Sequence, residues 1–286
     1  MIETDWTDSV GTAISYIEKH ITEDISAAEI AKQVNISPFY FQKGFAMLCG
    51  YTVGEYVRKR RLSLAGSELV SSSAGVLETA LKYGYDSPDS FTKAFTRFHG
   101  ITPAAAKKEG AVIRSFAPLK IKIALEGGSI MDYKIMKKES FTVLGAAKIF
   151  SYEGAAEEIP KFWGETFPMG KAPKFCGMYG INIDIDGNEF EYLIAGNYDP
   201  AEEIPEGCVT RVIPSFTWAV FPCVGAMPDS IHKIYEKIYS EWLPENRDYE
   251  IAGGYCFEMY GEPSEFKNGT KDEKYYSEIW IPVKEK

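Results

Sequence analysis

Apolar residues over the first 110 positions have the spacing of amphipathic helices. They recur at intervals of three and four residues from Val10 to Ile21, which predicts a first helix. Ser26-Ala-Ala-Glu29 is a capping-box sequence and predicts a short helix that ends near Val34. Further helices are expected over Thr52–Leu69 and Val76–Tyr83, and from the serine-proline pairs Ser37-Pro38 and Ser87-Pro88.

This helical region contains an internal repeat. Ser37–Phe45 matches Ser87–Phe95 at an offset of 50 residues, with the serine, the proline, a lysine and two phenylalanines in common. Gly50 and Gly100 follow the two segments in the same register. A repeat at a fixed offset indicates a duplicated supersecondary unit. Each unit consists of a short helix, a tight turn and a second helix, which is the helix-turn-helix pattern.

The second helix of each unit has an apolar face and a polar face. Phe41 and Phe45 are spaced four residues apart, as are Phe91 and Phe95, and we expect these rings to pack inward. The opposite face carries residue types that are able to hydrogen-bond to base edges in the DNA major groove, so we expect it to face DNA. In the two units these side chains belong to Tyr40, Gln42, Lys43, Ser90, Lys93 and Arg97.

The helix that connects the units supports DNA binding. It contains the basic run Arg58-Lys-Arg-Arg61, and we expect Arg58, Arg60 and Arg61 to lie over the phosphate backbone. About 18 residues give a helix of roughly 27 Å. That length is close to the ~34 Å between successive major-groove faces on one side of B-DNA. Two units on one chain are therefore expected to read adjacent grooves.

From Met131 onward the pattern changes to short strands and two helices. The helices are expected over Ala155–Phe167 and Asp229–Trp242, and Asp186-Gly187-Asn188 predicts a hairpin. The candidate strands are Phe141–Ile149, Lys174–Tyr179, Phe190–Ala195, Val209–Pro214, Thr217–Val224, Gly254–Tyr260 and Tyr276–Val283. We therefore expect a multidomain chain: an all-α domain over residues 1–110, a linker over 111–130 with a soft point at Gly127-Gly128, and an α+β domain of two related halves over 131–286.

Charge distinguishes the two parts. Residues 1–112 hold 12 Lys and Arg against 13 Asp and Glu, whereas residues 113–286 hold 19 against 28. The overall composition excludes long disorder, collagen and a coiled-coil rod. The chain has no apolar stretch near the ~20 residues of a membrane span and no signal peptide. Five cysteines without a Cys-x-x-Cys pair favour a reducing cytoplasm.

Residues 5–110 resemble the AraC/XylS family of transcription regulators. The resemblance rests on Ala80-x-x-x-Gly84-Tyr85-x-Ser87-x-x-x-Phe91-x-Lys93-x-Phe95 and on Gly100-Ile-Thr102-Pro103. It implies an all-helical domain with two helix-turn-helix units. By position, Phe39, Gln42 and Lys43 would face DNA from the first unit, and Asp89, Ser90 and Lys93 from the second. After Thr102-Pro103 the chain departs from the family, because Ala106-Lys107 stand where an aromatic residue and an arginine are usual.

The end of the chain has the pattern Glu278-Ile-Trp280-Ile-Pro282. Alternation along a strand places Glu278 and Trp280 on one face. With the two-helix layout, this pattern resembles the GyrI-like effector-binding domain over residues 131–286. That resemblance implies an aromatic pocket in which Glu278 pairs with a lipophilic cation. The candidate wall residues are Trp163, Tyr179, Tyr192, Trp218, Tyr255, Tyr260 and Trp280.

Together these patterns predict a cytoplasmic DNA-binding regulator that is controlled by a small lipophilic, cationic ligand. No metal site, cofactor motif or catalytic motif is found, so we expect neither an enzyme nor a cofactor. Two alternatives stay open for the second domain. It would be a hydrolase if Glu278 and a tyrosine act as a general base. It would be a docking module if its acidic surface binds a basic partner such as RNA polymerase.

Overall fold

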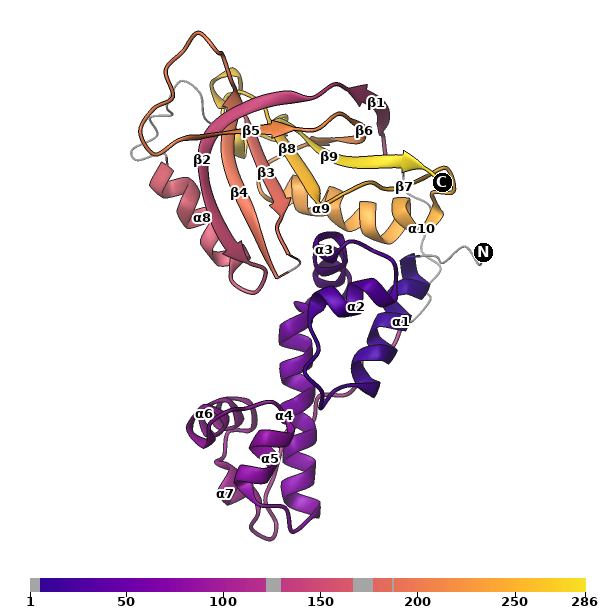
Figure 1. Ribbon diagram of the computed structural model, residues 1–286, viewed down its shortest axis with the longest axis vertical. Coiled ribbons are helices and arrows are strands. Elements are labelled where there is room, and N and C mark those ends of the chain that lie inside the picture. The colour runs from indigo at the N-terminus through magenta and orange to yellow at the C-terminus, as the bar shows by residue number, and fades with distance from the viewer. Residues whose placement is uncertain (1–5, 122–129, 167–176, 187) are drawn as a thin grey trace.

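The computed structural model describes residues 6–121, 130–166, 177–186 and 188–286. A helical part precedes a part built on one curved sheet with helices (Figure 1). The predicted fold class, all-α followed by α+β, is confirmed. The expected soft point at Gly127-Gly128, the hairpin residue Gly187 and most of the expected strand Lys174–Tyr179 lie outside the described residues. The division into 1–110, 111–130 and 131–286 stays a prediction.

Seven α-helices make up the described part of the first 110 residues. They are α1 (Trp6–Lys19), α2 (Ala27–Gln33), α3 (Pro38–Cys49), α4 (Val53–Ser71), α5 (Val76–Lys82), α6 (Pro88–His99) and α7 (Pro103–Ala106). The capping box of Ser26 and Glu29 is present, with both reciprocal hydrogen bonds. The repeated glycines also have a structural reason. Gly50 and Gly100 end α3 and α6 with φ of 70° and 82°, in the left-handed region that favours glycine.

The second helix-turn-helix unit packs around a buried histidine. The Nε2 atom of His99 lies 2.9 Å from the carbonyl oxygen of Leu62, and its Nδ1 accepts the backbone N–H of Arg114 at 3.1 Å. Burial lowers the pKa of His99, so the ring is held in its neutral form. These bonds tie α6 to α4 and to the chain segment that follows α7.

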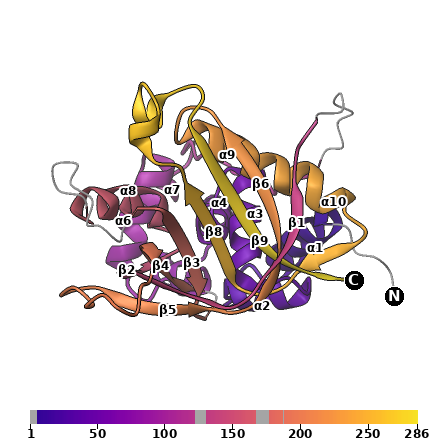
Figure 2. The same cartoon turned by 90° about the horizontal axis from the view of Figure 1, so that it is seen from above.

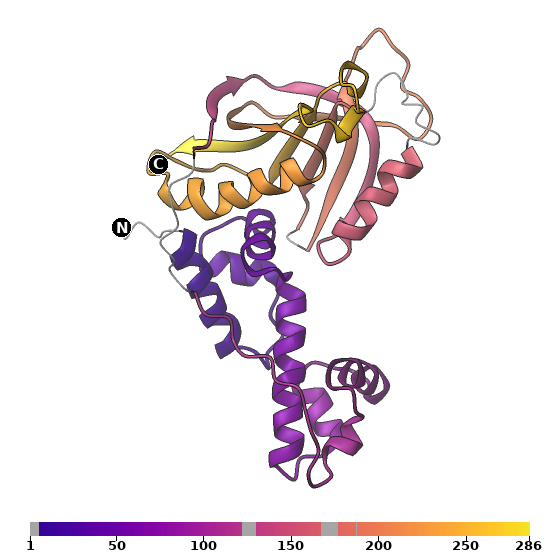
Figure 3. The same ribbon diagram turned by 180° about the vertical axis from the view of Figure 1, so that it is seen from behind.

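The segment after α7 runs back along α4 toward the first unit (Figure 3). The backbone N–H of Phe116 donates to Ser63 Oγ at 2.9 Å, and that of Leu119 donates to the Tyr56 hydroxyl at 3.2 Å. The start of the expected linker is therefore fixed to the helical part. No helix in the described part of the chain is long and apolar enough to cross a membrane.

One antiparallel sheet forms the base of the second part. Its strands are β1 (Lys134–Lys138), β2 (Phe141–Ser151), β3 (Tyr179–Asp184), β4 (Glu189–Asn197), β5 (Val209–Ile213), β6 (Phe216–Val224), β7 (Tyr249–Ile251), β8 (Tyr255–Tyr260) and β9 (Tyr276–Glu285). The order across the sheet is β1-β6-β9-β8-β3-β4-β2-β5, and β7 pairs with β9. Figure 2 shows the curvature of this sheet from above. The strands β1 and β7 were not expected from the sequence.

The sheet consists of two related halves, as expected. One half has the order β2, helix α8 (Ala155–Thr166), β3, β4, and the other has β6, helix α9 (Asp229–Lys237), β8, β9. The halves meet where β3 pairs with β8 at the centre of the sheet. A π-helical turn over Ile238–Trp242 and the short α10 (Leu243–Glu245) extend α9, and two 3₁₀ turns, Pro263–Glu265 and Gly269–Lys271, precede β9.

The two faces of the sheet differ in what covers them. Helices α8 and α9 lie on the face turned toward α3 (Figures 1 and 3). On the opposite face the strands pack their own side chains together. Trp218, Phe257 and Trp280 lie there with ring centroids 5.5 to 6.1 Å apart. The position of a side chain along each strand therefore decides whether it faces the helices or this second core.

The helical part packs directly on the second part through α1 and α3. Phe39, Tyr40, Phe41 and Phe45 of α3 share one apolar core with Ile231, Tyr235, Ile238 and Tyr239. At Gly44 an added Cβ would lie 2.1 Å from Trp6 and 2.8 Å from Tyr239, so the helix backbone approaches this interface closely. The contact is apolar and tight, which stabilises the arrangement by removing ring surface from water.

Replacing Gly66 with alanine should destabilise the second unit. An alanine usually stabilises a helix interior by about 1 kcal/mol relative to glycine. Here the added Cβ would lie 2.5 Å from Cε1 and 2.6 Å from Nε2 of His99. We expect Gly66→Ala to lower the free energy of unfolding by roughly 1–3 kcal/mol, measured by urea denaturation.

The matched control is Gly164→Ala in α8, where nothing lies within 4 Å of the added Cβ. It should leave stability unchanged or raise it by up to ~1 kcal/mol. Equal effects of the two substitutions would show that the His99 packing does not constrain Gly66.

Candidate functional site

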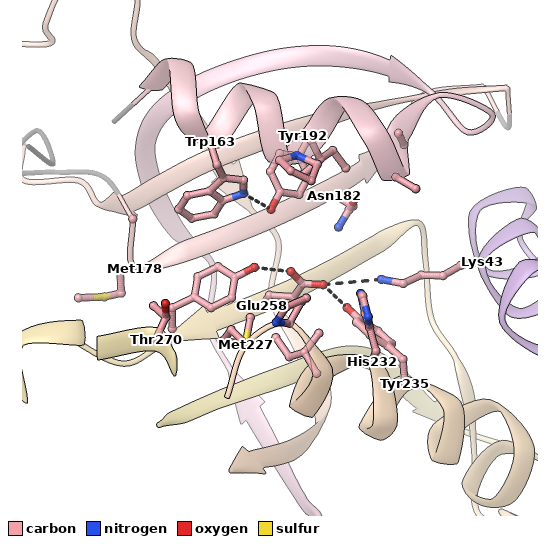
Figure 4. A pocket seen from close by; sticks show the side chains of 18 of the residues that line it. Lys43, Trp163, Met178, Asn182, Tyr192, Met227, His232, Tyr235, Glu258 and Thr270 are labelled. Atoms are coloured by element: carbon pink, nitrogen blue, oxygen red, sulfur yellow. Dashed lines mark hydrogen bonds and ion pairs between the residues drawn. The ribbon is translucent and has the colours of Figure 1, made fainter. Parts of the chain in front are cut away.

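A cavity of about 1440 Å³ lies between the helix-covered face of the sheet and α3. Helix α8 contributes Ile159 and Trp163 to its wall, and α9 contributes Ile231 and Tyr235. The strands contribute Asn182, Tyr192, Glu258 and Tyr260, and the helical part closes the cavity with Phe39, Gln42, Lys43, Ala46 and Met47. Figure 4 shows polar groups in a mostly apolar, aromatic surround, which is the usual make-up of a small-molecule site.

The carboxylate of Glu258 is the acidic centre of this cavity. Its Oε1 accepts a hydrogen bond from the Tyr235 hydroxyl at 2.6 Å, and its Oε2 accepts one from the Tyr260 hydroxyl. The side chain of Glu258 is 14% exposed. Burial, together with the nearby carboxylate, raises the pKa of both tyrosines well above the ordinary value. Both phenols therefore stay protonated and act as hydrogen-bond donors.

Lys43 reaches this carboxylate from α3. Its Nζ lies 3.9 Å from Oε1 of Glu258 and 3.3 Å from Sγ of Cys256. The same ammonium lies 3.7 Å from the centroid of the Tyr235 ring, which is cation–π geometry. The lysine side chain is 19% exposed. A cation from the helical part thus lies among the acidic and aromatic groups of the second part.

The far wall of the cavity is a ring cluster. The Nε1–H of Trp163 donates to the Tyr192 hydroxyl at 3.0 Å, and the Trp163 ring meets Tyr260 edge-on at 5.4 Å. Burial raises the pKa of Tyr192. These contacts fix the orientation of the rings that line this wall.

Glu278 does not line this cavity, because it lies on the opposite face of the sheet. On the adjacent strands Glu278 pairs with Met259 and Ile279 pairs with Glu258, so the two glutamates point to opposite faces. The carboxylate of Glu278 is satisfied within its own face. It accepts from Trp280 Nε1 at 2.6 Å and from the Tyr276 hydroxyl at 2.6 Å, and it lies 3.2 Å from Lys134 Nζ.

The other predicted ligand residues also divide between the two faces of the sheet. Trp163, Tyr192 and Tyr260 line the cavity. Trp218 and Trp280 belong to the core on the opposite face, and Tyr179 and Tyr255 pack against it. Sequence reasoning missed Glu258, Tyr235 and Lys43 as cavity residues. The signal for Glu258 was available, since Cys256, Glu258 and Tyr260 alternate along β8 with residues of the other face.

The first predicted DNA-reading helix lies against the second part. Phe39 is 1% exposed and Tyr40 is fully buried, with its hydroxyl donating to the carbonyl of Tyr255. Lys43 lies in the cavity as described, and Gln42 is among the residues that line it. In this arrangement the outward face of α3 contacts protein.

The basic run on α4 is largely engaged in protein contacts. Arg60 is buried and donates from Nε and Nη2 to the two carboxylate oxygens of Glu18, each at 2.8 Å. Arg61 donates to the carbonyls of Ile21 and Glu23. Arg58 is exposed and lies 3.3 Å from Glu153. The guanidinium of Arg60 also lowers the pKa of Glu18 against the opposing effect of burial.

The second unit presents its polar face to solvent. Asp89, Ser90, Lys93 and Arg97 on α6 are all exposed, while Phe91 and Phe95 are buried beneath them. This is the disposition expected for a helix that enters the major groove. Among the described residues no cluster of three His, Cys, Asp or Glu could hold a metal ion.

Each of the two parts matches a known protein family. The family described as integron-associated effector binding protein matches residues 134–283. The chain belongs to this family. A helix-turn-helix domain family matches residues 30–109, ahead of the effector-binding region. The resemblances to AraC-type regulators and to GyrI-like domains are confirmed, and this family member is a DNA-binding transcription regulator with an effector-binding domain.

Two regulators illustrate the likeness. HTH-type transcriptional activator AarP of Providencia stuartii is 30% identical over 115 residues, which are 40% of this chain and 85% of that protein. Transcriptional regulator Rob of Salmonella typhimurium is 27% identical over 286 residues, which are 94% of this chain and 96% of that protein. A solved structure of SAV2435 bound to tetraphenylphosphonium is 23% identical with a TM-score of 0.45, and covers 54% of this chain and 94% of that one.

Arg60 and Arg58 should differ in what their removal does to the fold. Arg60→Gln leaves the partly buried carboxylate of Glu18 without its charged partner, so the free energy of unfolding should fall by roughly 2–4 kcal/mol. Arg58→Gln removes an exposed ion pair, which is worth less than ~1 kcal/mol. Urea denaturation of the two variants measures the difference. Equal stabilities would show that Arg60 does not brace α4 against α1.

Proposed function

We propose that the cavity binds a lipophilic organic cation through the carboxylate of Glu258. The observation that carries this proposal is the placement of Glu258 among ring faces, with two phenols that donate to it. A carboxylate in a poorly hydrated cavity is costly without a positive partner. A bound cation supplies that partner, and each ring face adds about 0.5–2 kcal/mol of cation–π attraction.

The cavity has few hydrogen-bonding groups among its described residues, so it suits a class of ligands rather than a single compound. Ile159, Ile231 and Met47 present apolar surface beside the rings. Apolar walls recognise size and hydrophobicity, whereas hydrogen-bonding walls recognise a specific pattern of donors and acceptors. The hydrolytic alternative pairs a glutamate with a tyrosine as general base, whereas the hydroxyls of Tyr235 and Tyr260 both donate to Glu258.

For DNA we propose that both units read adjacent major grooves. In the second unit the contacts would come from Asp89, Ser90, Lys93 and Arg97, which are already exposed on α6. In the first unit they would come from Phe39, Tyr40, Gln42 and Lys43 on α3. Such a regulator works where promoter DNA is, so we place it in the cytoplasm, with RNA polymerase as a further partner.

Glu258→Gln should weaken binding of tetraphenylphosphonium, used as a probe of the proposed ligand class. The substitution keeps the shape of the side chain, removes the negative charge and replaces one acceptor oxygen with an NH2 donor. We expect a loss of about 10- to 100-fold in affinity, which corresponds to ~1.4–2.8 kcal/mol, measured by isothermal titration calorimetry.

Glu278→Gln is the matched control, because it removes the same charge from the opposite face of the sheet. It should leave the affinity within about twofold of the unmodified chain, which is below ~0.5 kcal/mol. If Glu278→Gln loses affinity for tetraphenylphosphonium and Glu258→Gln does not, the assignment of the two glutamates is reversed.

Lys93→Ala should weaken DNA binding, because it removes a contact that α6 would make to a phosphate or a base. The duplex for this test is selected by the full-length protein from a randomised pool in the presence of tetraphenylphosphonium. Fluorescence anisotropy between 50 and 200 mM salt should show a lower affinity, and a salt dependence reduced by ~1 if the contact is to phosphate. Lys274→Ala, an exposed lysine of the second part, is the control and should bind like the unmodified chain.

A further inference from the structure

Lys43 holds the position in the cavity that a cationic ligand would need. Its ammonium is 3.9 Å from the Glu258 carboxylate, 3.7 Å from the Tyr235 ring centroid and 5.8 Å from the ring centroid of Phe39. A carboxylate combined with aromatic faces is also the surround that recognises an organic cation. The lysine is therefore equivalent to a ligand that belongs to the chain itself.

The face of α3 that carries Lys43 is also covered by the second part. Phe39 and Tyr40 are buried against the second part, and Tyr40 is bonded to the backbone of β8. A recognition helix must place this face within the major groove, which is ~12 Å wide and leaves no room for another domain on that face. As long as α3 is docked, the first unit cannot read DNA.

We propose that Lys43 is an internal competitor of the cationic ligand, and that its displacement from Glu258 releases α3 for DNA. This inference rests on the proposed function of the cavity and adds its regulation. The docked chain has Lys43 on Glu258 and α3 covered. The released chain has the external cation on Glu258 and α3 free. A cation favours the released state because only there is Glu258 available to it, and a shift of this kind requires such a difference in affinity.

The charge of the ligand then decides the direction of the response. A cation competes with Lys43, whereas an anion of the same shape is repelled by Glu258 and gains nothing from release. Tetraphenylphosphonium and tetraphenylborate are probes of nearly equal size and opposite charge. We expect the phosphonium to raise the affinity for DNA and the borate not to raise it.

A covalent clamp tests the link between docking and DNA binding. An added Cβ at Gly54 in α4 would lie 3.0 Å from Cδ and 3.5 Å from Cγ of Glu153 in the second part. Side chains at positions 54 and 153 therefore meet across the two parts, so Gly54→Cys with Glu153→Cys is the pair chosen to cross-link the docked state. The full-length double variant is compared in its oxidised and reduced forms on the selected duplex. Each single variant is the control for the chain's own cysteines.

The reduced double variant should bind the duplex, with tighter binding in tetraphenylphosphonium. The oxidised form should bind at least tenfold more weakly and not respond to the phosphonium. Equal binding by the oxidised and reduced forms would overturn the inference and leave the proposed function intact. Absence of binding by the reduced form, with or without the phosphonium, would instead refute the proposed DNA contacts of the two units and the inference with them.

Lys43→Met provides an independent measurement on the ligand alone. The substitution keeps an apolar side chain of similar length but removes the competing ammonium. Tetraphenylphosphonium should then bind about tenfold more tightly, a change of ~1.4 kcal/mol. Unchanged or weaker binding by Lys43→Met would show that the lysine does not compete. If Glu258→Gln binds tetraphenylphosphonium weakly and Lys43→Met does not, then Glu258 is the partner of the ligand and Lys43 is its competitor.

Discussion

The arrangement of this regulator depends on the pairing of a carboxylate in a mostly apolar cavity with a cation. Glu258 has two phenolic donors, but hydrogen bonds from neutral groups do not balance its charge. In the docked chain the balancing charge comes from Lys43, on a helix more than 200 residues away in the sequence. Because electrostatic attraction is stronger where water is excluded, this contact is the one through which we propose that the ligand site and α3 are coupled.

The sheet separates two carboxylates whose surroundings differ. Glu258 and Glu278 lie on neighbouring strands but project to opposite faces. On the face without helices, Trp280, Tyr276 and Lys134 satisfy Glu278 within the second part. On the other face, α8, α9 and the strands together line the cavity. The same side-chain chemistry is therefore satisfied within the second part on one face, and on the other face it pairs with a cation from the helical part.

Local sequence signals were sufficient for the longer helices, most strands and the repeat, but not for the site. Serine caps and the glycines at positions 50 and 100 depend on a few neighbouring residues, so they are readable from the chain. Alternation also correctly separates Glu278 and Trp280 from their neighbours. It does not tell which face receives the helices, because that follows from long-range strand pairing. For the same reason Glu258 and Glu278, each beside aromatic residues in a strand, could not be distinguished.

The two copies of the repeat have similar sequences but lie in different environments. Lys43 and Lys93 occupy the same position in the two units, yet Lys93 is exposed and Lys43 contacts the second part. The difference lies in what surrounds each helix. Rings of α3 and of the π-helical turn after α9 form a shared core, so docking has an apolar contribution besides the ion pair. Because a change from 1:99 to 99:1 requires a preference of about 10⁴, an effective ligand must combine its charge with extensive ring contact. A small hydrophilic cation would replace the charge of Lys43 without that contact, so the switch that we propose requires the aromatic surface of the cavity as well as its carboxylate.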